Sequence, residues 1–183
     1  MGYGLVENME SNMTERERKI IDHIKKWEGG WANDPDDSGG CTNMGITIGC
    51  FREYYGRYME CADLKKLTEN QWLTIFYKKF YNKIRAGEIQ NDSVCMMVLD
   101  MCWMSGRVTA IRKIQRCLKV ADDGIVGPIT LNALNSNPKQ VFDNLKYMRE
   151  CWYDAIVYNS PKKKKFLRGW LNRLNDIKYE ENN

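Results

Sequence analysis

The sequence predicts a mainly α-helical protein: a bundle of helices around one central buried helix, with at most a small β-hairpin. Three observations support this prediction. Apolar residues recur at spacings of three and four along most of the chain, as they do on the buried face of a helix. Two segments begin with a Thr-x-x-Glu or Thr-x-x-Gln capping box. Residues 92–106 are apolar nearly all round, which is typical of a helix enclosed by others.

The first predicted helix covers residues 15–28. Thr14 and Glu17 form its capping box, in which the two side chains satisfy backbone N–H groups that have no partner inside the helix. Isoleucines then recur at helical spacing, and Gly29–Gly30 ends the helix. We therefore expect an amphipathic helix that stops just before the double glycine.

A loop is predicted after this helix, over residues 31–50, with a short hairpin within residues 42–50 as its only regular structure. The second capping box, Thr68–Gln71, begins the next helix, which is expected over residues 69–84. Its aromatic residues fall on one face, so this helix too should contribute to a core.

Five further helices are predicted in the rest of the chain. The central helix ends at a glycine, and a proline stands at the first position of a later helix, where its fixed φ is favourable. The last two helices carry tryptophans at core spacing. These helices are expected at residues 93–105, 108–118, 128–135, 139–158 and 162–178.

The domain organisation follows from length and composition. The 183 residues, 43% of them hydrophobic, suffice for one core with a small appended subdomain. No linker, repeat or low-complexity block divides the chain. We expect an N-terminal tail (residues 1–13), a first helical region (14–106), and a C-terminal helical subdomain packed onto it (107–183).

Charge and hydropathy exclude several classes of function. A net charge of +4 is too small to indicate a nucleic-acid partner. No run of about 18 apolar residues occurs, so no integral membrane segment is predicted. The first twelve residues lack the apolar stretch of a secretory signal, so we expect synthesis in the cytoplasm without a signal peptide. The single histidine, His23, has no paired cysteines beside it, and neither a metal nor a cofactor is predicted.

The cysteines are odd in number and scattered without CxxC spacing, and several fall inside apolar helical patterns. We expect all of them to remain unpaired thiols that pack as small hydrophobic groups, as in a protein folded in a reducing compartment. They are Cys41, Cys50, Cys61, Cys95, Cys102, Cys117 and Cys151.

Glu28 is the first candidate for chemistry. It shares a helix face with Ile21 and Ile24, so its carboxyl group is expected to be partly buried. Partial burial favours the protonated form of a carboxyl group, which is the form that a general acid needs near neutral pH. The alternative is a glutamate that turns into solvent at the helix end or pairs with an arginine.

The loop after Glu28 supplies three more acids, Asp34, Asp36 and Asp37. Glycoside hydrolysis uses one carboxyl group as an acid and a second group opposite it as base, nucleophile or water-positioning residue. A glutamate at a helix end and an acidic loop facing it fit that requirement. Turns stabilised by Asx hydrogen bonds are a compatible explanation of the same residues.

A calcium loop is the competing explanation. Asp34, Asp36, Ser38 and Gly39 match positions one, three, five and six of such a loop. Position twelve is Gly45, however, where calcium loops place a bidentate glutamate. The pattern therefore favours the carboxylate-pair hypothesis over calcium.

Two other charged features have simpler explanations. Asp100 lies alone in the buried helix, where we expect it to cap a loop backbone or to meet an arginine. Lys162–Lys165 is expected to be a solvated helix face, with attraction to an anionic cell-wall polymer as a secondary interpretation.

A family resemblance rests on residues 28–47, EGGWANDPDDSGGCTNMGIT. This run resembles the signature of glycoside hydrolase family 108, which comprises muramidases of the lysozyme-like superfamily. Weaker similarity continues at YKKFY (77–81) and at LDMCWMSG (99–106), where Met104 replaces an expected asparagine. DGIVGPIT (123–130) and, near the C-terminus, FLRGWLNR resemble motifs of predicted peptidoglycan-binding domains.

The resemblance implies a lysozyme-like fold and assigns candidate site residues. Glu28, before the double glycine, is the expected general acid, and Asp37 and Thr42 occupy positions comparable to the second carboxylate and the water-positioning threonine of the superfamily. The expected substrate-binding residues are Trp31 and Asp34 in the loop and Gly124 and Thr130 in the second motif.

The function expected from the sequence is hydrolysis of peptidoglycan at the β-1,4 bond between N-acetylmuramic acid and N-acetylglucosamine. A holin or a dedicated exporter is the expected route of release to the bacterial cell wall. The alternative is a non-catalytic peptidoglycan-binding or secretion-accessory protein, which the replacement at Met104 favours. The intact Glu28 with its two glycines favours the enzyme.

Overall fold

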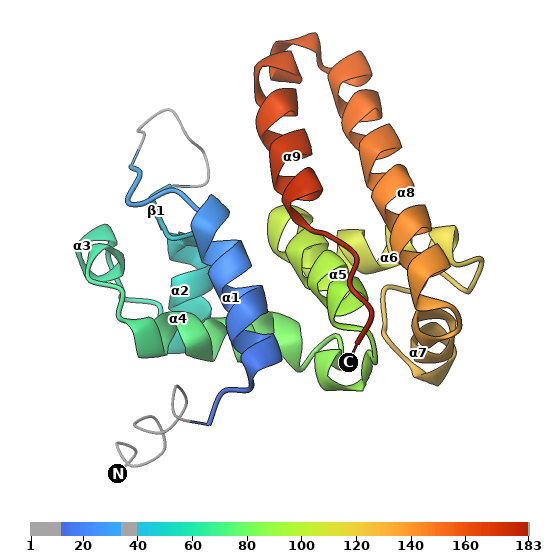
Figure 1. Cartoon of the computed structure of the whole chain (residues 1–183). Coiled ribbons are helices and arrows are strands. Elements are labelled where there is room, and N and C mark those ends of the chain that lie inside the picture. Colours follow the sequence, from blue (N-terminus) through green and yellow to red (C-terminus); the bar gives the residue numbers. More distant parts are fainter. Residues whose placement is uncertain (1–11, 34–39, 183) are drawn as a thin grey trace. The chain divides into compact units, whose positions relative to one another are not determined.

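The computed structural model describes residues 12–33 and 40–182, and the chain divides into two compact units, residues 1–79 and 80–183. Figure 1 shows the regular structure of these described residues to be almost entirely helical, with one two-stranded antiparallel sheet. The predicted fold class is therefore confirmed. The sequence-based division after residue 106 stays a prediction, and the compact units divide before the central helix.

In the first unit, α1 (Glu15–Trp27) begins where the sequence predicts and ends one residue earlier. The Thr14 hydroxyl accepts a hydrogen bond from the Glu17 N–H at 3.2 Å, and the Glu17 carboxylate accepts one from the Thr14 N–H at 2.8 Å. The isoleucines of α1 are buried on one face. The cap and the buried face together explain why this segment is helical.

The sheet is the hairpin expected within residues 42–50. Strand β1 (Thr42–Asn43) pairs antiparallel with β2 (Ile46–Thr47). The two residues between them, Met44 and Gly45, both have positive φ, 47° and 77°. Positive φ at both central residues is the requirement of the two-residue turn that suits the twist of a hairpin.

Two short helices were not predicted from the sequence, α2 (Ile48–Tyr55) and α3 (Cys61–Lys65). The first begins after Thr47, whose hydroxyl accepts a hydrogen bond from the Cys50 N–H at 3.2 Å. With eight and five residues, these helices are too short to repeat an apolar spacing over several turns. Periodicity therefore gives no signal for them.

The helix predicted over residues 69–84 begins at its capping box but does not continue regularly. It consists of α4 (Glu69–Ile75) followed by a π-helical segment, η1 (Phe76–Tyr81). Trp72 and Phe76 are fully buried and stack with ring centroids 5.4 Å apart. π-Helical turns occur mostly as short interruptions of α-helices, and local sequence patterns do not distinguish the two.

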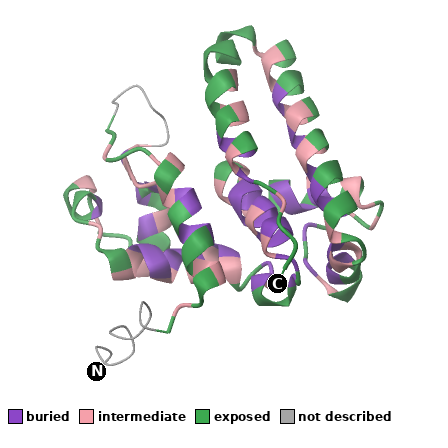
Figure 2. Cartoon of the chain, viewed as in Figure 1, coloured by how far each residue is buried: buried purple, intermediate pink, exposed green. Residues whose placement is uncertain are grey.

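The second unit is built around α5 (Asp92–Ser105). Nine of its residues are buried, including Asp100, and Figure 2 shows the concentration of buried residues along it. The Asn91 side chain caps the helix by accepting a hydrogen bond from the Val94 N–H at 3.0 Å. The prediction of a central buried helix is thus confirmed.

Around α5 lie α6 (Arg107–Cys117) and α8 (Pro138–Asn159), and α8 forms an antiparallel hairpin with α9 (Lys164–Asp176). Each of these helices begins within two residues of its prediction. The remaining elements of this unit are η2 (Ala86–Glu88), α7 (Pro128–Asn135) and η3 (Pro161–Lys163).

Beyond α9 the chain returns to the start of α5 (Figure 1). The Asn182 side chain accepts a hydrogen bond from the Asp92 N–H at 3.1 Å and donates one to the Gln90 carbonyl at 2.6 Å. The Glu180 N–H donates to the Ser93 hydroxyl at 2.9 Å. The C-terminal segment thereby supplies partners at a helix end where backbone N–H groups lack them.

The expectation of seven unpaired cysteines is wrong for two of them. Cys41 and Cys61 form a disulfide, with Cα atoms 5.9 Å apart. Both lie outside the helices predicted from the sequence, so the helical core spacing that indicates packed thiols never applied to them. Cys95 and Cys102, which do have that spacing, are buried thiols in α5.

Within residues 12–33 and 40–182, no helix combines the length and apolarity needed to cross a membrane. The same residues contain no group of three or more His, Cys, Asp and Glu side chains able to hold a metal ion.

Candidate active site

Glu28 stands at the point where the chain leaves α1. Its backbone is extended (φ −84°, ψ 136°), and its N–H donates to the Lys25 carbonyl at 3.1 Å. The side chain is half-buried, whereas Ile24 and Ile21, one and two turns earlier, are buried. The carboxyl group therefore lies at the border between the core face of α1 and solvent.

The segment after Glu28 returns to the hairpin through a two-residue bridge. Ala32 and Thr42 exchange both backbone hydrogen bonds, at 2.9 and 2.8 Å. Ala32 lies four residues after Glu28 in the chain. Thr42, a predicted catalytic residue, is half-buried.

Three of the predicted acidic residues, Asp34, Asp36 and Asp37, fall on residues 34–39 and lie outside the described residues. Their assignment as catalytic or substrate-binding groups therefore stays a prediction. The other predicted binding residue of this loop, Trp31, is half-buried, and Lys65 Nζ lies 5.8 Å from its ring centroid.

The hairpin that carries Thr42 is fixed to its surroundings at three points. The Asn43 side chain donates to the carbonyls of Leu64 and Lys65 at 3.0 and 3.3 Å. The indole of the buried Trp72 donates to the Met44 carbonyl at 3.0 Å. These contacts hold β1 and its turn against α3 and α4.

The third point is the disulfide. Cys41 directly precedes Thr42 and is fully buried, and its partner Cys61 is the first residue of α3. Asn43, Trp72 and this disulfide support the site, and no sequence pattern predicts them in that role. Asn43 and Cys41 lie inside the motif of residues 28–47, but nothing in the local sequence indicates their distant partners.

The thiol of Cys50, in the first unit, lies close to a cation. Lys79 Nζ lies 3.3 Å from its Sγ and 2.7 Å from the Glu53 carboxylate. Burial raises the pKa of the Cys50 thiol, and the nearby Lys79 does not reverse this effect. The protonated thiol that results is a poor nucleophile, so this cluster does not compete with Glu28 as a catalytic centre.

The second motif, residues 123–130, forms a turn that is organised by Gln115 of α6. The Gln115 amide donates to the Asp123 carboxylate at 2.8 Å and to the Thr130 hydroxyl at 3.1 Å. Its amide oxygen accepts a hydrogen bond from the Gly124 N–H at 2.8 Å. Gln115 is 1% exposed, so the turn is held from inside the unit.

Gly124 and Thr130, the predicted substrate-binding residues of this motif, are both buried. Gly124 has φ +80°, and a Cβ at this position would lie 3.0 Å from Val108 Cγ1. A glycine is therefore required for the backbone and for close packing. The exposed large hydrophobic side chains of the turn are Ile125 and Ile129, at 64% and 72% exposure.

Asp100 meets arginine, as one of the sequence-based alternatives proposed. Arg149 Nη2 and Arg173 Nε donate to its two carboxylate oxygens at 2.8 and 2.7 Å, and all three residues are buried. His23 is buried on α1. Met104, where the sequence motif led us to expect an asparagine, is 37% exposed.

Comparisons with known proteins agree with the two motifs. Residues 21–106 match the family model of glycosyl hydrolase 108, and residues 109–175 match that of a predicted peptidoglycan domain. The solved structure of SagA from Brucella abortus is similar, with 28% sequence identity, 87% of this chain and 90% of that chain covered, and a TM-score of 0.75. A comparison with curated protein sequences gives no significant match.

Proposed function

We propose that the protein is an N-acetylmuramidase. The proposal starts from its families: residues 21–106 belong to glycosyl hydrolase family 108 and residues 109–175 to the predicted peptidoglycan domain family. Its reaction is hydrolysis of the β-1,4 bond between N-acetylmuramic acid and N-acetylglucosamine in peptidoglycan. Glycoside hydrolase chemistry follows from the family, and the bond cleaved and the residues that act on it are the proposal.

Glu28 is the proposed general acid. Its place at the end of α1 supports this role, because the helix fixes the backbone up to Trp27 while the carboxyl group stays half-exposed. Proton donation to the leaving oxygen requires such a group, held on a rigid element and accessible to the substrate. Two exposed glycines, Gly29 and Gly30, follow it and leave room for a sugar ring to approach.

The pairing of Ala32 with Thr42 is the observation that carries the proposal. It fixes the Thr42 backbone beside Ala32, which lies four residues after Glu28 in the chain. The Thr42 hydroxyl is proposed to position the attacking water, and Asp37 to stabilise the oxocarbenium-like transition state or to activate that water.

The test is Glu28→Gln in the full chain, assayed by the loss of turbidity of purified peptidoglycan with mass analysis of the products. General acid catalysis contributes about 10²–10⁴ in rate, so cleavage is expected to fall at least a hundredfold while the fold is kept. Glu15→Gln is the matched control, because Glu15 is an exposed acid on the same helix. Wild-type clearance by Glu28→Gln would overturn the assignment.

A second candidate is a non-catalytic peptidoglycan-binding or secretion-accessory protein. The match of residues 109–175 to a peptidoglycan domain favours it. Co-sedimentation of full-length Glu28→Gln with insoluble peptidoglycan separates binding from cleavage. If wild type and variant both sediment and neither releases fragments, the accessory function replaces the enzyme. For either function, we propose that a holin or a dedicated exporter gives access to the cell wall.

A further inference from the structure

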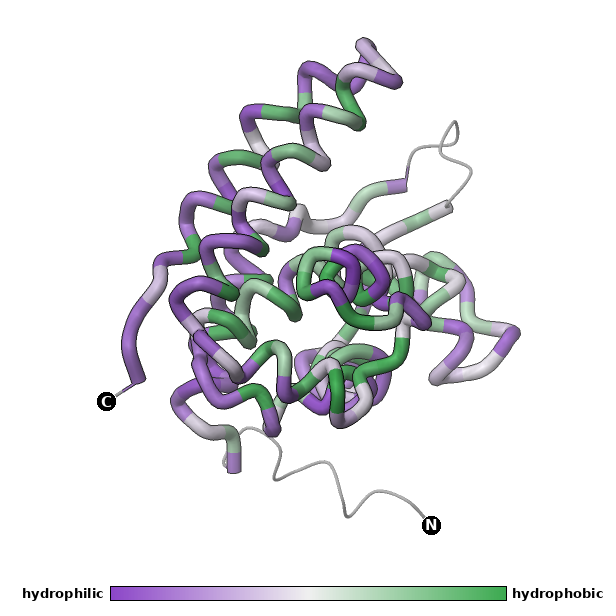
Figure 3. The backbone as a smooth tube through the Cα atoms, turned by 90° about the vertical axis from the view of Figure 1, so that its right-hand side faces the viewer, coloured by the Kyte–Doolittle hydropathy of each residue, from purple (hydrophilic) through white to green (hydrophobic). Residues whose placement is uncertain are grey.

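The end of the α8–α9 hairpin is the longest stretch of the second unit that contains no buried residue. We define the hairpin tip as residues 155–172, and none of these residues is buried (Figure 2). Along the hairpin, hydrophobic and hydrophilic stretches alternate (Figure 3). The residues of α8 and α9 that do pack into the unit lie outside the tip, as Tyr153 and Leu174 do.

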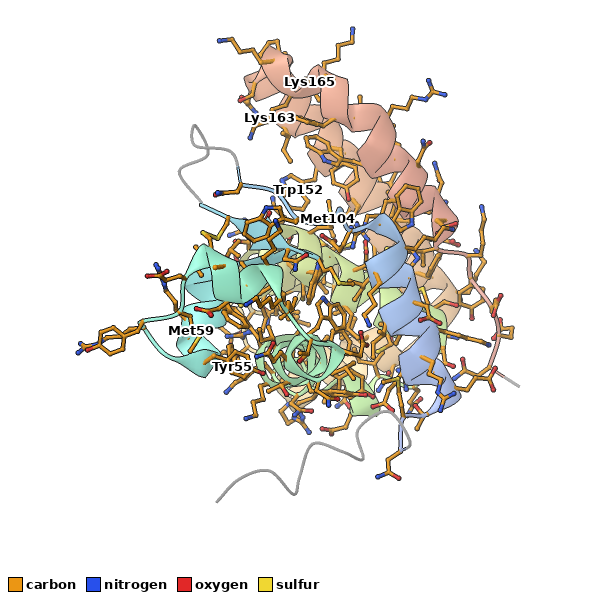
Figure 4. All side chains as sticks on the ribbon, turned by 90° about the vertical axis from the view of Figure 1, so that its left-hand side faces the viewer. Tyr55, Met59, Met104, Trp152, Lys163 and Lys165 are labelled. Atoms are coloured by element: carbon orange, nitrogen blue, oxygen red, sulfur yellow. A yellow bond between two sulfur atoms is a disulfide. The ribbon has the colours of Figure 1, made fainter. Side chains whose placement is uncertain are left out.

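The tip carries cations without compensating charge. Lys162–Lys165 and Arg168 are exposed, and residues 155–172 contain no aspartate or glutamate. None of these five cations forms an ion pair with a described residue. Figure 4 shows Lys163 and Lys165 at the end of the hairpin.

Folding does not explain this placement of lysines. The last two of them begin α9, whose first turn contains no acidic residue and whose N-cap makes no side-chain hydrogen bond. Cations near a helix N-terminus oppose the helix dipole, and adjacent like charges repel each other. The cluster therefore lowers the stability of the hairpin, which indicates a role outside the fold.

Aromatic rings accompany the cations. Tyr158 is 87% exposed and Phe166 is 49% exposed. Phe166 stacks on Trp170 with centroids 6.1 Å apart, and Trp170 in turn contacts the buried Tyr153 at 5.5 Å. Lys165 Nζ lies 4.9 Å from the Phe166 centroid. This chain of rings holds an exposed aromatic side chain in place beside the lysines.

We propose that the hairpin tip docks on the surface of a membrane rich in anionic phospholipids. The lysines and Arg168 would meet the lipid phosphates, and Phe166 and Tyr158 would enter the headgroup region. Clustered lysines next to exposed aromatic residues suit this interface, because long cationic side chains reach phosphates while the rings replace water near the acyl boundary. The proposal is independent of the hydrolase activity.

A glycan is the less suitable occupant of the tip. Sugar hydroxyl groups need both hydrogen-bond donors and hydrogen-bond acceptors. Apart from Tyr158, however, every ionisable side chain of the tip is a cation, which can only donate. The Asn159 amide already donates to the Ala155 carbonyl at 2.8 Å. Charge complementarity therefore favours a phosphate-rich surface over a neutral sugar chain.

The experiment is sedimentation of the full chain with vesicles of phosphatidylcholine alone or mixed with phosphatidylglycerol. Binding is expected only to the mixed vesicles and should weaken as salt is raised. The combined variant K162Q/K163Q/K164Q/K165Q is expected to bind at least about a hundredfold less tightly, since each lysine near an anionic surface adds favourable free energy. The double variant Y158S/F166S should lose about tenfold.

A matched control removes the same charge elsewhere. The four lysines replaced by glutamine are exposed and lie outside the tip: Lys66, Lys83, Lys119 and Lys178. This control should bind vesicles nearly as wild type does, and the tip variant should hydrolyse lipid-free peptidoglycan at the wild-type rate. The proposal is overturned if control and tip variants lose vesicle binding equally, if neutral vesicles bind as well, or if the tip variant loses peptidoglycan sedimentation instead.

Discussion

Arg149 on α8 donates a hydrogen bond of 2.8 Å to Asp100 on α5, and both side chains are fully buried. Arg173 on α9 donates to the second carboxylate oxygen at 2.7 Å, and Tyr153 accepts a further hydrogen bond from Arg149 at 2.8 Å. One carboxylate thus links three helices of the second unit. It explains why a charged residue interrupts the apolar sequence of α5.

Asp100→Asn should strongly destabilise the second unit. The substitution leaves two buried guanidinium groups without their anion, and breaking a buried ion pair from one side costs about 3–5 kcal/mol. Urea unfolding followed by circular dichroism would measure the loss. Asp143→Asn, which removes an exposed partner of Lys139 on α8, should cost less than about 1 kcal/mol. Equal losses in the two variants would contradict the role given to Asp100.

Reduction of the Cys41–Cys61 disulfide should lower both stability and activity. A disulfide that closes a loop of 20 residues typically contributes about 2–4 kcal/mol. Cys41 also directly precedes Thr42, so its release should loosen the strand that carries this proposed catalytic residue. We expect dithiothreitol to lower the Tm of the wild type but not that of C41S/C61S.

Cys151→Ser serves as the control for that experiment, because Cys151 is an exposed thiol. It should retain the full response to dithiothreitol. A wild-type Tm that reductant does not change, with the disulfide shown to be reduced by mass, would refute the stabilising role.

Local signals predicted most of the long helices, and long-range contacts account for what the sequence did not reveal. Thr14 and Gln71 belong to capping boxes, which are complete within four residues and can be read directly. Gln115 and Cys61, in contrast, act on partners across a turn or a loop, and their own neighbours give no indication of them. Gly124 is a similar case, because its sequence neighbours do not reveal that it packs against Val108, and its assignment as a substrate-binding residue stays a prediction.

Asp123 should contribute to the acid sensitivity of the second unit. Hydrogen bonds from the Ile125 N–H and then from Gln115 hold the pKa of Asp123 below its ordinary value. Because the folded state lowers this pKa, the contribution is full above the unfolded pKa and is lost as pH falls through the folded pKa. The free energy of unfolding of Asp123→Asn should therefore depend less steeply on pH below about pH 4.

Urea unfolding at a series of pH values would measure this difference. Asp154→Asn is the control, because it removes an exposed carboxylate of α8 that lies outside this hydrogen-bonded turn. If the free energy of unfolding of Asp123→Asn depended on pH as steeply as that of the wild type, the hydrogen bonds of Asp123 would not distinguish its charged from its neutral carboxyl group.

Asn43→Ala tests whether the contacts of the hairpin position Thr42, the residue proposed to orient the attacking water. Asn43 touches no proposed reacting group, and its amide instead joins β1 to the last carbonyls of α3. Loss of these hydrogen bonds should cost about 1–2 kcal/mol of stability. Because Thr42 directly precedes Asn43, kcat for peptidoglycan cleavage should also fall, by about tenfold for a small misplacement of the site, while KM changes little. Asn43→Asp should not rescue the rate, since a carboxylate cannot donate to a carbonyl, whereas Asn43→Gln should restore part of it.

Asn132→Ala is the control, at an exposed position on α7, and should change neither the stability nor kcat. A kcat that stays at the wild-type value in Asn43→Ala, despite lower stability, would reduce Asn43 to a purely structural role.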